Sequence, residues 1–204
     1  NYKVEDQNLY AIGTSEQTLL AYHDSEILDY ESLPLKYSAV TPCFRTEAGS
    51  YGRNSKGAYR VHQFHKMEQI IFCDPEESEK FHEETLSNVE KLINLLEIPY
   101  HVVRVCVGDM GAPGYKKYDV ESWFPSFNAY RETHSLTNLL DFQTRRLNIR
   151  SVKNRKKIFP HTISSTMATD RLLFSLIENF QQQDGSIILP TALASIMGKK
   201  IINV

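Results

Sequence analysis

The alternation of side chains between positions 60 and 68 is the clearest pattern in this chain. The segment RVHQFHKME lacks the apolar spacing of a helix. A β-strand points alternate side chains to opposite faces of a sheet, so one face would carry Arg60, His62, Phe64, Lys66 and Glu68. In that row Arg60, Phe64 and Glu68 would stand about 13 Å apart, since a strand rises about 3.3 Å per residue.

The segment before this strand predicts its hairpin partner. Arg45 and Glu47 are two positions apart and share one face of a strand. The connecting loop is small and polar, and it contains Gly49, Gly52, Arg53, Lys56 and Gly57. A charged face of this kind is either the solvated side of an antiparallel sheet or a recognition surface. A ring among the charges favours recognition, because arginine suits phosphates and an aromatic ring suits a base.

Helices are predicted in three places. Residues 16–24 follow a capping Thr14 or Ser15, and residues 76–98 follow an acidic and proline-containing start. The longer segment has an apolar stripe that would pack on the sheet, namely Phe81, Leu86, Val89, Leu92, Ile93 and Leu96. Within 161–185 a stripe is ended by Gly185, and it consists of Leu172, Leu173, Leu176, Ile177 and Phe180.

The remaining strands are expected to be short. Leu9–Ile12 ends at Gly13, residues 101–107 are apolar and β-branched, and residues 119–124 and 130–135 alternate around a turn. A last short strand, residues 186–190, stops at Pro190. The glycine-rich segment 108–119 lacks the GK[ST] of a phosphate-binding loop and is predicted to be a turn.

Composition excludes several classes of protein. The 204 residues carry a formal net charge of −2, so any contact with nucleic acid must be local. Cys43, Cys73 and Cys106 are widely spaced and fit neither a disulfide framework nor a cysteine zinc site. No apolar run could span a membrane. The chain does not begin with methionine, so a leader could have been lost upstream.

A basic cluster follows the second hairpin. It is either a solvated turn or a contact for RNA phosphates, and it comprises Arg145, Arg146, Arg150, Lys153, Arg155, Lys156 and Lys157.

These motifs together resemble a known family. Phe44-Arg45-Thr46-Glu47, a loop, and then Arg60, Phe64 and Glu68 at four-residue spacing resemble motif 2 of class II aminoacyl-tRNA synthetases. The segments TPCFRTEAG and RVHQFHKMEQ are similar to sequences of the seryl-tRNA synthetase family. The resemblance implies an α+β fold with an antiparallel sheet flanked by helices. It also implies one catalytic core over 1–204, with motif 2 at 41–69 and motif 3 at 161–183.

The resemblance implies an ATP site. Arg171 matches the motif 3 arginine, and Glu132, Ser135 and Asn138 match a Glu-x-x-Ser segment that binds a divalent ion in the family. Arg45 and Arg171 are the expected catalytic residues, and Glu132 and Ser135 the expected Mg²⁺ ligands. The expected ATP contacts are Arg45, Glu47, Arg60, Val61, Phe64, Glu132, Ser135 and Arg171. His134, where the family usually has serine, is not expected to bind zinc.

The same resemblance implies a serine site. Its expected contacts are Thr14, Glu16, Arg45, Glu68 and Thr166. The chain departs from the family here, because Ser164-Ser165-Thr166 replaces an Asn-Gly-Ser or Asn-Ala-Thr triplet and one residue before Arg171 is missing. Thr166 is the best match to the hydroxyl that recognises serine, and Ser165 is the alternative.

The implied function is that of a serine–tRNA ligase acting on serine, ATP and tRNA(Ser). Two alternatives remain: a paralogue that has kept the fold for binding or regulation, and a ligase that loads a carrier protein. The family's tRNA-binding helical hairpin and its motif 1, which forms a homodimer interface, do not lie in these residues. We expect no membrane-spanning segment and no membrane among the partners. An intracellular location is expected, in a bacterial cytoplasm or a mitochondrion.

Overall fold

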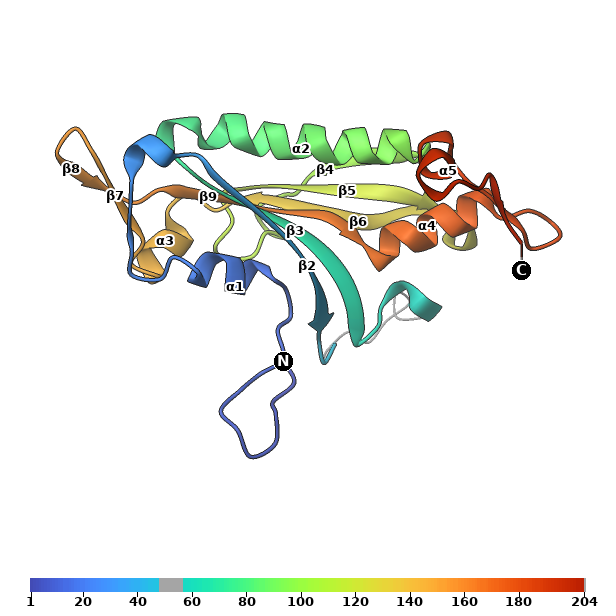
Figure 1. The fold of residues 1–204 in the computed structure, drawn as a ribbon, viewed down its shortest axis with the longest axis horizontal. Coiled ribbons are helices and arrows are strands. Elements are labelled where there is room, and N and C mark those ends of the chain that lie inside the picture. The colour runs from blue at the N-terminus through green and yellow to red at the C-terminus, as the bar shows by residue number, and fades with distance from the viewer. Residues whose placement is uncertain (48–56, 204) are drawn as a thin grey trace.

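The protein is an α+β fold built on one six-stranded antiparallel sheet (Figure 1). The computed structural model describes residues 1–47 and 57–203. The strand order is β2-β3-β9-β6-β5-β4, and each neighbouring pair is antiparallel. In that order the strands are Leu35–Phe44, Gln63–Cys73, His161–Thr169, Ala129–Asn138, Lys116–Phe124 and Tyr100–Arg104. The expected fold class is confirmed.

Helix α2 (Ser78–Leu95) covers one face of this sheet (Figure 1). Val89 and Ile93 are fully buried and pack in one core cluster with Val120 and Leu136 of the sheet. This is the predicted helix of 76–98, preceded by the 3₁₀ turn η3 (Pro75–Glu77). Burial of its apolar stripe holds the sheet rigid beneath the opposite face.

The opposite face carries the shorter helices α1 (Glu16–Ala21) and α3 (Phe142–Arg146) toward one end (Figure 1). Helix α1 ends three residues earlier than predicted, and the Oγ1 of Thr14 accepts a hydrogen bond from the Glu16 amide at 3.2 Å. Helix α4 (Asp170–Phe180) continues directly from β9 and buries Leu172 and Leu176.

Several expected elements differ from those observed. Leu9–Ile12 forms no strand, only a single bridge between Lys3 and Tyr10. Strand β3 begins at Gln63, so Arg60 and His62 precede it, after the 3₁₀ turn η2 (Gly57–Tyr59). The predicted loop residues Gly49, Gly52, Arg53 and Lys56 lie outside the described residues.

The basic cluster divides between helix α3, which holds Arg145 and Arg146, and a small hairpin, which holds the rest. Strands β7 (Arg150–Lys153) and β8 (Lys156–Ile158) pair antiparallel around Asn154 and Arg155. Both turn residues have positive φ, 50° and 64°, which suits a two-residue hairpin turn. Strand β1 (Ile27–Leu28) adds to β7 in parallel.

The other elements are short. They are the 3₁₀ turns η1 (Tyr30–Ser32) and η4 (Pro125–Phe127), strands β10 (Ile187–Ile188) and β11 (Ile201–Ile202), and helix α5 (Thr191–Met197). Among the described residues, no helix has the length and apolar character needed to cross a membrane.

Candidate active site

Two adjoining cavities lie on the sheet face that α2 leaves uncovered. The first has a volume of about 270 Å³ and the second about 220 Å³. They share three wall residues, Lys66 of β3, Ser135 of β6 and Thr166 of β9. Three neighbouring strands therefore form the partition between the two cavities.

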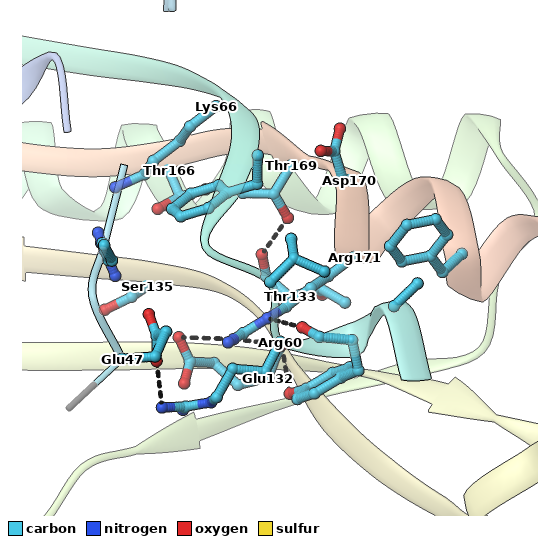
Figure 2. Close-up of a pocket in the computed structure, with 16 residues that line it drawn as sticks. Glu47, Arg60, Lys66, Glu132, Thr133, Ser135, Thr166, Thr169, Asp170 and Arg171 are labelled. Atoms are coloured by element: carbon cyan, nitrogen blue, oxygen red, sulfur yellow. Dashed lines mark hydrogen bonds and ion pairs between the residues drawn. The ribbon is translucent and has the colours of Figure 1, made fainter. Parts of the chain in front are cut away.

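The first cavity gathers every residue predicted to contact a nucleotide (Figure 2). They come from the segment just after β2, from the segment that leads into β3 and the first residues of β3, from β6, and from the start of α4. These residues are Arg45, Glu47, Arg60, Val61, Phe64, Glu132, Ser135 and Arg171. Segments more than 100 positions apart in the chain thus converge on one site.

Arg60 is held by an ion pair. Arg60 Nη1 lies 2.8 Å from Glu47 Oε2 (Figure 2). Arg60 was predicted to share a strand face with Phe64. This prediction is wrong, because β3 begins only at Gln63 and the chain before it is irregular. It still reaches the same cavity through its long side chain.

Arg171 is fixed by Glu132, which the sequence analysis singled out, and by Tyr59, which it did not. Its Nε donates to the Tyr59 carbonyl at 3.2 Å, and its Nη1 donates to the Glu132 carbonyl at 3.3 Å. The guanidinium also lies 4.4 Å from the centre of the Tyr59 ring. Tyr59 OH in turn donates to the Glu132 carbonyl at 2.9 Å, and burial raises the pKa of this phenol. Nothing in the sequence marked Tyr59, because it acts on another side chain through its backbone and ring.

Arg45 lies against Phe64 on the other side of the cavity. Its guanidinium carbon is 5.2 Å from the ring centre, and its Nε donates to the Gly13 carbonyl at 3.0 Å. This contact fixes one edge of the guanidinium and leaves the fork available to an anion. The flat Phe64 ring, with the Arg45 guanidinium over it, suits stacking by a planar heterocycle.

Glu132 and Ser135 reach the first cavity because strand β6 is bulged. Residues three apart on a regular strand point to opposite faces. Here Val120 pairs with His134 while Glu121 pairs with Glu132, so Thr133 is an extra residue that resets the alternation. Both side chains then line the cavity.

Asn138, the third residue of that segment, has a different environment. It is fully buried, and its Oδ1 accepts a hydrogen bond from the Leu140 amide at 3.1 Å. His134 is also buried, and its Nδ1 lies 2.9 Å from Thr133 Oγ1. Within 1–47 and 57–203 no group of three or more His, Cys, Asp or Glu residues could hold a metal ion.

The second cavity is organised around a buried carboxylate. Glu68 is only 1% exposed and is paired with Lys66. Ser164 Oγ donates to its Oε1 at 3.0 Å, and Thr14 Oγ1 donates to its Oε2 at 3.3 Å. Burial raises the pKa of Glu68, and the nearby Lys66 ammonium opposes that shift. An ionised Glu68 in this pocket needs a cation.

The predicted amino-acid contacts divide between the cavities. Glu16, Glu68 and Thr166 line the second cavity and Arg45 lines the first, whereas Thr14 contacts Glu68. The Glu16 carboxylate is further fixed by Gln143, whose Nε2 donates to it at 2.6 Å.

The unusual Ser164-Ser165-Thr166 segment lies on β9, opposite the Glu68 carboxylate. Ser164 donates to Glu68, and Thr166 lines both cavities. Ser165 is fully buried and contributes to neither cavity wall. Of the two hydroxyl groups proposed from the sequence, the geometry favours Thr166.

Comparison with known proteins shows the family of this chain. Residues 2–180 match the family described as the tRNA synthetase class II core domain (G, H, P, S and T). A serine–tRNA ligase of Thermococcus sibiricus is 48% identical over 98% of this chain and 45% of its own length. One from Archaeoglobus fulgidus is 49% identical over 94% of this chain and 43% of its own length. This chain therefore spans less than half of these relatives.

Solved structures agree with the fold. The chain superimposes on a crystal structure of seryl-tRNA synthetase from Pyrococcus horikoshii complexed with ATP with a TM-score of 0.94 and 46% identity, over 99% of this chain and 46% of that one. A cytoplasmic serine–tRNA ligase from Naegleria fowleri in complex with AMP gives a TM-score of 0.91 and 38% identity, over 99% and 49%. The chain belongs to the class II core domain family of tRNA synthetases.

Proposed function

We propose that this chain is the catalytic core of a serine–tRNA ligase, which joins serine to tRNA(Ser) at the expense of ATP. The observation that carries the proposal is the junction of the two cavities at Lys66, Ser135 and Thr166. One cavity is rich in arginine and the other contains a buried carboxylate, so a triphosphate and an amino acid can meet there. The similarity to an ATP-bound seryl-tRNA synthetase supports this assignment.

In the nucleotide half, Phe64 stacks on adenine and Glu47 accepts from its amino group, while Val61 completes the wall. Arg60 and Arg171 hold the outer phosphates. Arginine suits this role because its planar fork binds phosphate through two hydrogen bonds. The contacts of Arg171 with Tyr59 and Glu132 place it before any ligand arrives, so little entropy is lost on binding.

Glu132 and Ser135 fit a magnesium site. The residues supply one carboxylate and one hydroxyl on the same cavity wall, and Mg²⁺ takes oxygen ligands while keeping several waters and substrate phosphates. When bound, the ion neutralises phosphate charge. The protein contributes the bulge at Thr133 that aims both oxygen ligands at one place.

In the amino-acid half, Glu68 receives the serine ammonium together with Thr14 and Glu16, and Thr166 binds the hydroxyl. A pocket that hydrogen-bonds a substrate hydroxyl can reject analogues lacking it by about 10⁴-fold. The buried position of Glu68 strengthens its interaction with a cation, because little water screens it.

The reaction requires no covalent attachment to the protein. An oxygen of the serine carboxylate attacks the α-phosphorus of ATP, the bond to the β-phosphate breaks, and pyrophosphate leaves with its electron pair. Arg45 holds the carboxylate and the α-phosphate together, which is catalysis by position and charge. A hydroxyl at the tRNA 3′ end then attacks the acyl carbon of the seryl-adenylate, the bond from that carbon to the phosphate oxygen breaks, and AMP leaves with the electron pair while the hydroxyl loses its proton.

The substrates of the whole enzyme follow from this reaction, and they are serine, ATP and tRNA(Ser). The homodimer is a separate part of the proposal and rests on the family resemblance. A tRNA substrate places the enzyme inside the cell, in a cytoplasm or a mitochondrion.

Two assays test the proposal against its alternatives. Serine-dependent exchange of pyrophosphate into ATP should occur, and a binding or regulatory paralogue would show none. Charging of tRNA(Ser) should follow, whereas a ligase that loads a carrier protein would exchange pyrophosphate but leave tRNA uncharged.

A further inference from the structure

Lys66 is the one residue of the shared wall that carries a charge. Its side chain is 12% exposed, and its ammonium pairs with Glu68 and lies 3.4 Å from Thr14 Oγ1. Glu68 and Thr14 are two of the three groups proposed above to receive the substrate ammonium, and Glu16 is the third. In the structure, an ammonium of the protein itself lies beside Glu68 and Thr14.

Serine alone would meet an occupied carboxylate. A second ammonium beside Lys66 would place two positive charges on Glu68, and like charges at this range repel strongly where water is scarce. Ser164 and Thr14 already donate to the two oxygens of Glu68. Glu16 also lines this cavity and adds a negative charge, but the position beside Glu68 becomes available to the serine ammonium when Lys66 moves away.

The first cavity offers Lys66 a stronger anion. Lys66 lines that cavity too, near Thr166 (Figure 2). A nucleoside triphosphate brings several negative charges, whereas Glu68 carries one. Lysine is a flexible point charge with freely rotating donors, so its ammonium can change partners without movement of the backbone.

We propose that Lys66 couples the two cavities by moving its ammonium from Glu68 to the phosphates when the nucleotide binds, which opens Glu68 to the ammonium of the amino acid. This inference rests on the proposed function and adds an order to it. Nucleotide tightens serine binding, and by thermodynamic linkage serine tightens nucleotide binding by the same factor.

The experiment is calorimetric titration of serine with and without saturating α,β-methylene ATP and Mg²⁺. In the wild type the nucleotide should lower the serine Kd by about 5-fold or more, the usual range of such coupling. Adenosine, which has no phosphates, should leave the Kd unchanged. Equal coupling by adenosine, or none by the triphosphate, would overturn the inference without the need for any variant.

Variants locate the effect on the side chain. Lys66→Met and Lys66→Gln, both checked for cooperative thermal unfolding, should give one serine Kd regardless of nucleotide. Lys116→Met is the matched control, because the Lys116 side chain is similarly buried, at 15% exposed, and pairs with Glu83 at 2.7 Å but lines neither cavity; it should keep the wild-type coupling. Coupling that persists in both Lys66 variants would refute the role of Lys66. A wild type that binds neither serine nor nucleotide would instead refute the proposed function.

Discussion

Glu132 and Ser135 line the same cavity although they stand three positions apart on β6, because Thr133 is an extra residue in that strand. Glu132→Gln should therefore lower serine-dependent pyrophosphate exchange by about 10²-fold, the usual effect of removing a group that steadies transition-state charge. The loss should be partly recovered at high Mg²⁺ concentration.

The matched control for that substitution is Glu121→Gln. Glu121 faces Glu132 across the strand pair, but its carboxylate bonds His101 Nε2 at 2.6 Å and does not line the cavity. It should retain wild-type exchange. An equal loss in both variants would mean that the general negative charge of this face matters, rather than a particular ligand.

Arg45 and Arg171 are predicted to act on the transition state. Arg45→Ala or Arg171→Ala should reduce exchange by at least about 10³-fold while the melting temperature changes little. Arg145→Ala is the control, since its guanidinium pairs with Asp141 at 2.6 Å on an exposed helix. Wild-type exchange rates in either active-site variant would contradict the assignment.

Glu68→Ala should raise the KM for serine far more than the KM for ATP. The reason is that Glu68 belongs to the second cavity and is absent from the wall of the first. Steady-state exchange at varied serine and varied ATP separates the two constants. Equal increases in both would show that the amino-acid pocket is misplaced.

Thr166 and Ser165 are neighbours with different surroundings. Thr166→Val should weaken serine by about 10-fold, the order expected for one lost hydrogen bond, and should improve the relative use of alanine. Ser165→Ala should leave the serine KM unchanged, because Ser165 lies outside both cavity walls. The opposite ranking would identify Ser165 as the serine-recognising hydroxyl.

His134 predicts a specific dependence of stability on pH. Burial lowers the pKa of its imidazole from 6.5 to about 4. The unfolded chain therefore binds a proton first as pH falls, so the folded state is favoured above 6.5 and loses stability between 6.5 and 4. This loss amounts to about 3 kcal/mol, since one pKa unit is about 1.4 kcal/mol. Urea unfolding at pH 7 and pH 4.5 should show a smaller drop in His134→Asn than in the wild type.

The sequence predicted which residues come together in the first cavity, because these residues occur in short motifs whose chemistry is local. Arg45, Glu47 and Phe64 were recognisable from their type and spacing, and all three line the first cavity. The strand face predicted for Arg60 was wrong in detail, since β3 begins only at Gln63. A long side chain tolerates such an error in backbone position.

The sequence did not predict the features that depend on the register between distant strands. The bulge at Thr133, and a second one where Glu68 pairs with Thr166 while Met67 pairs with Ala168, leave no mark on the residue pattern. The alternation of the strand predicts the correct face for Lys66 but indicates no role for it. Its importance follows from its position between two cavities, which only the folded chain defines.

The most direct test of the shared site is a crystal structure with a non-hydrolysable seryl-adenylate analogue. The adenine should lie on Phe64 in the first cavity, the seryl ammonium should contact Glu68 in the second, and Arg45 should contact the group that links them. An analogue bound with its seryl group outside the second cavity would contradict the account.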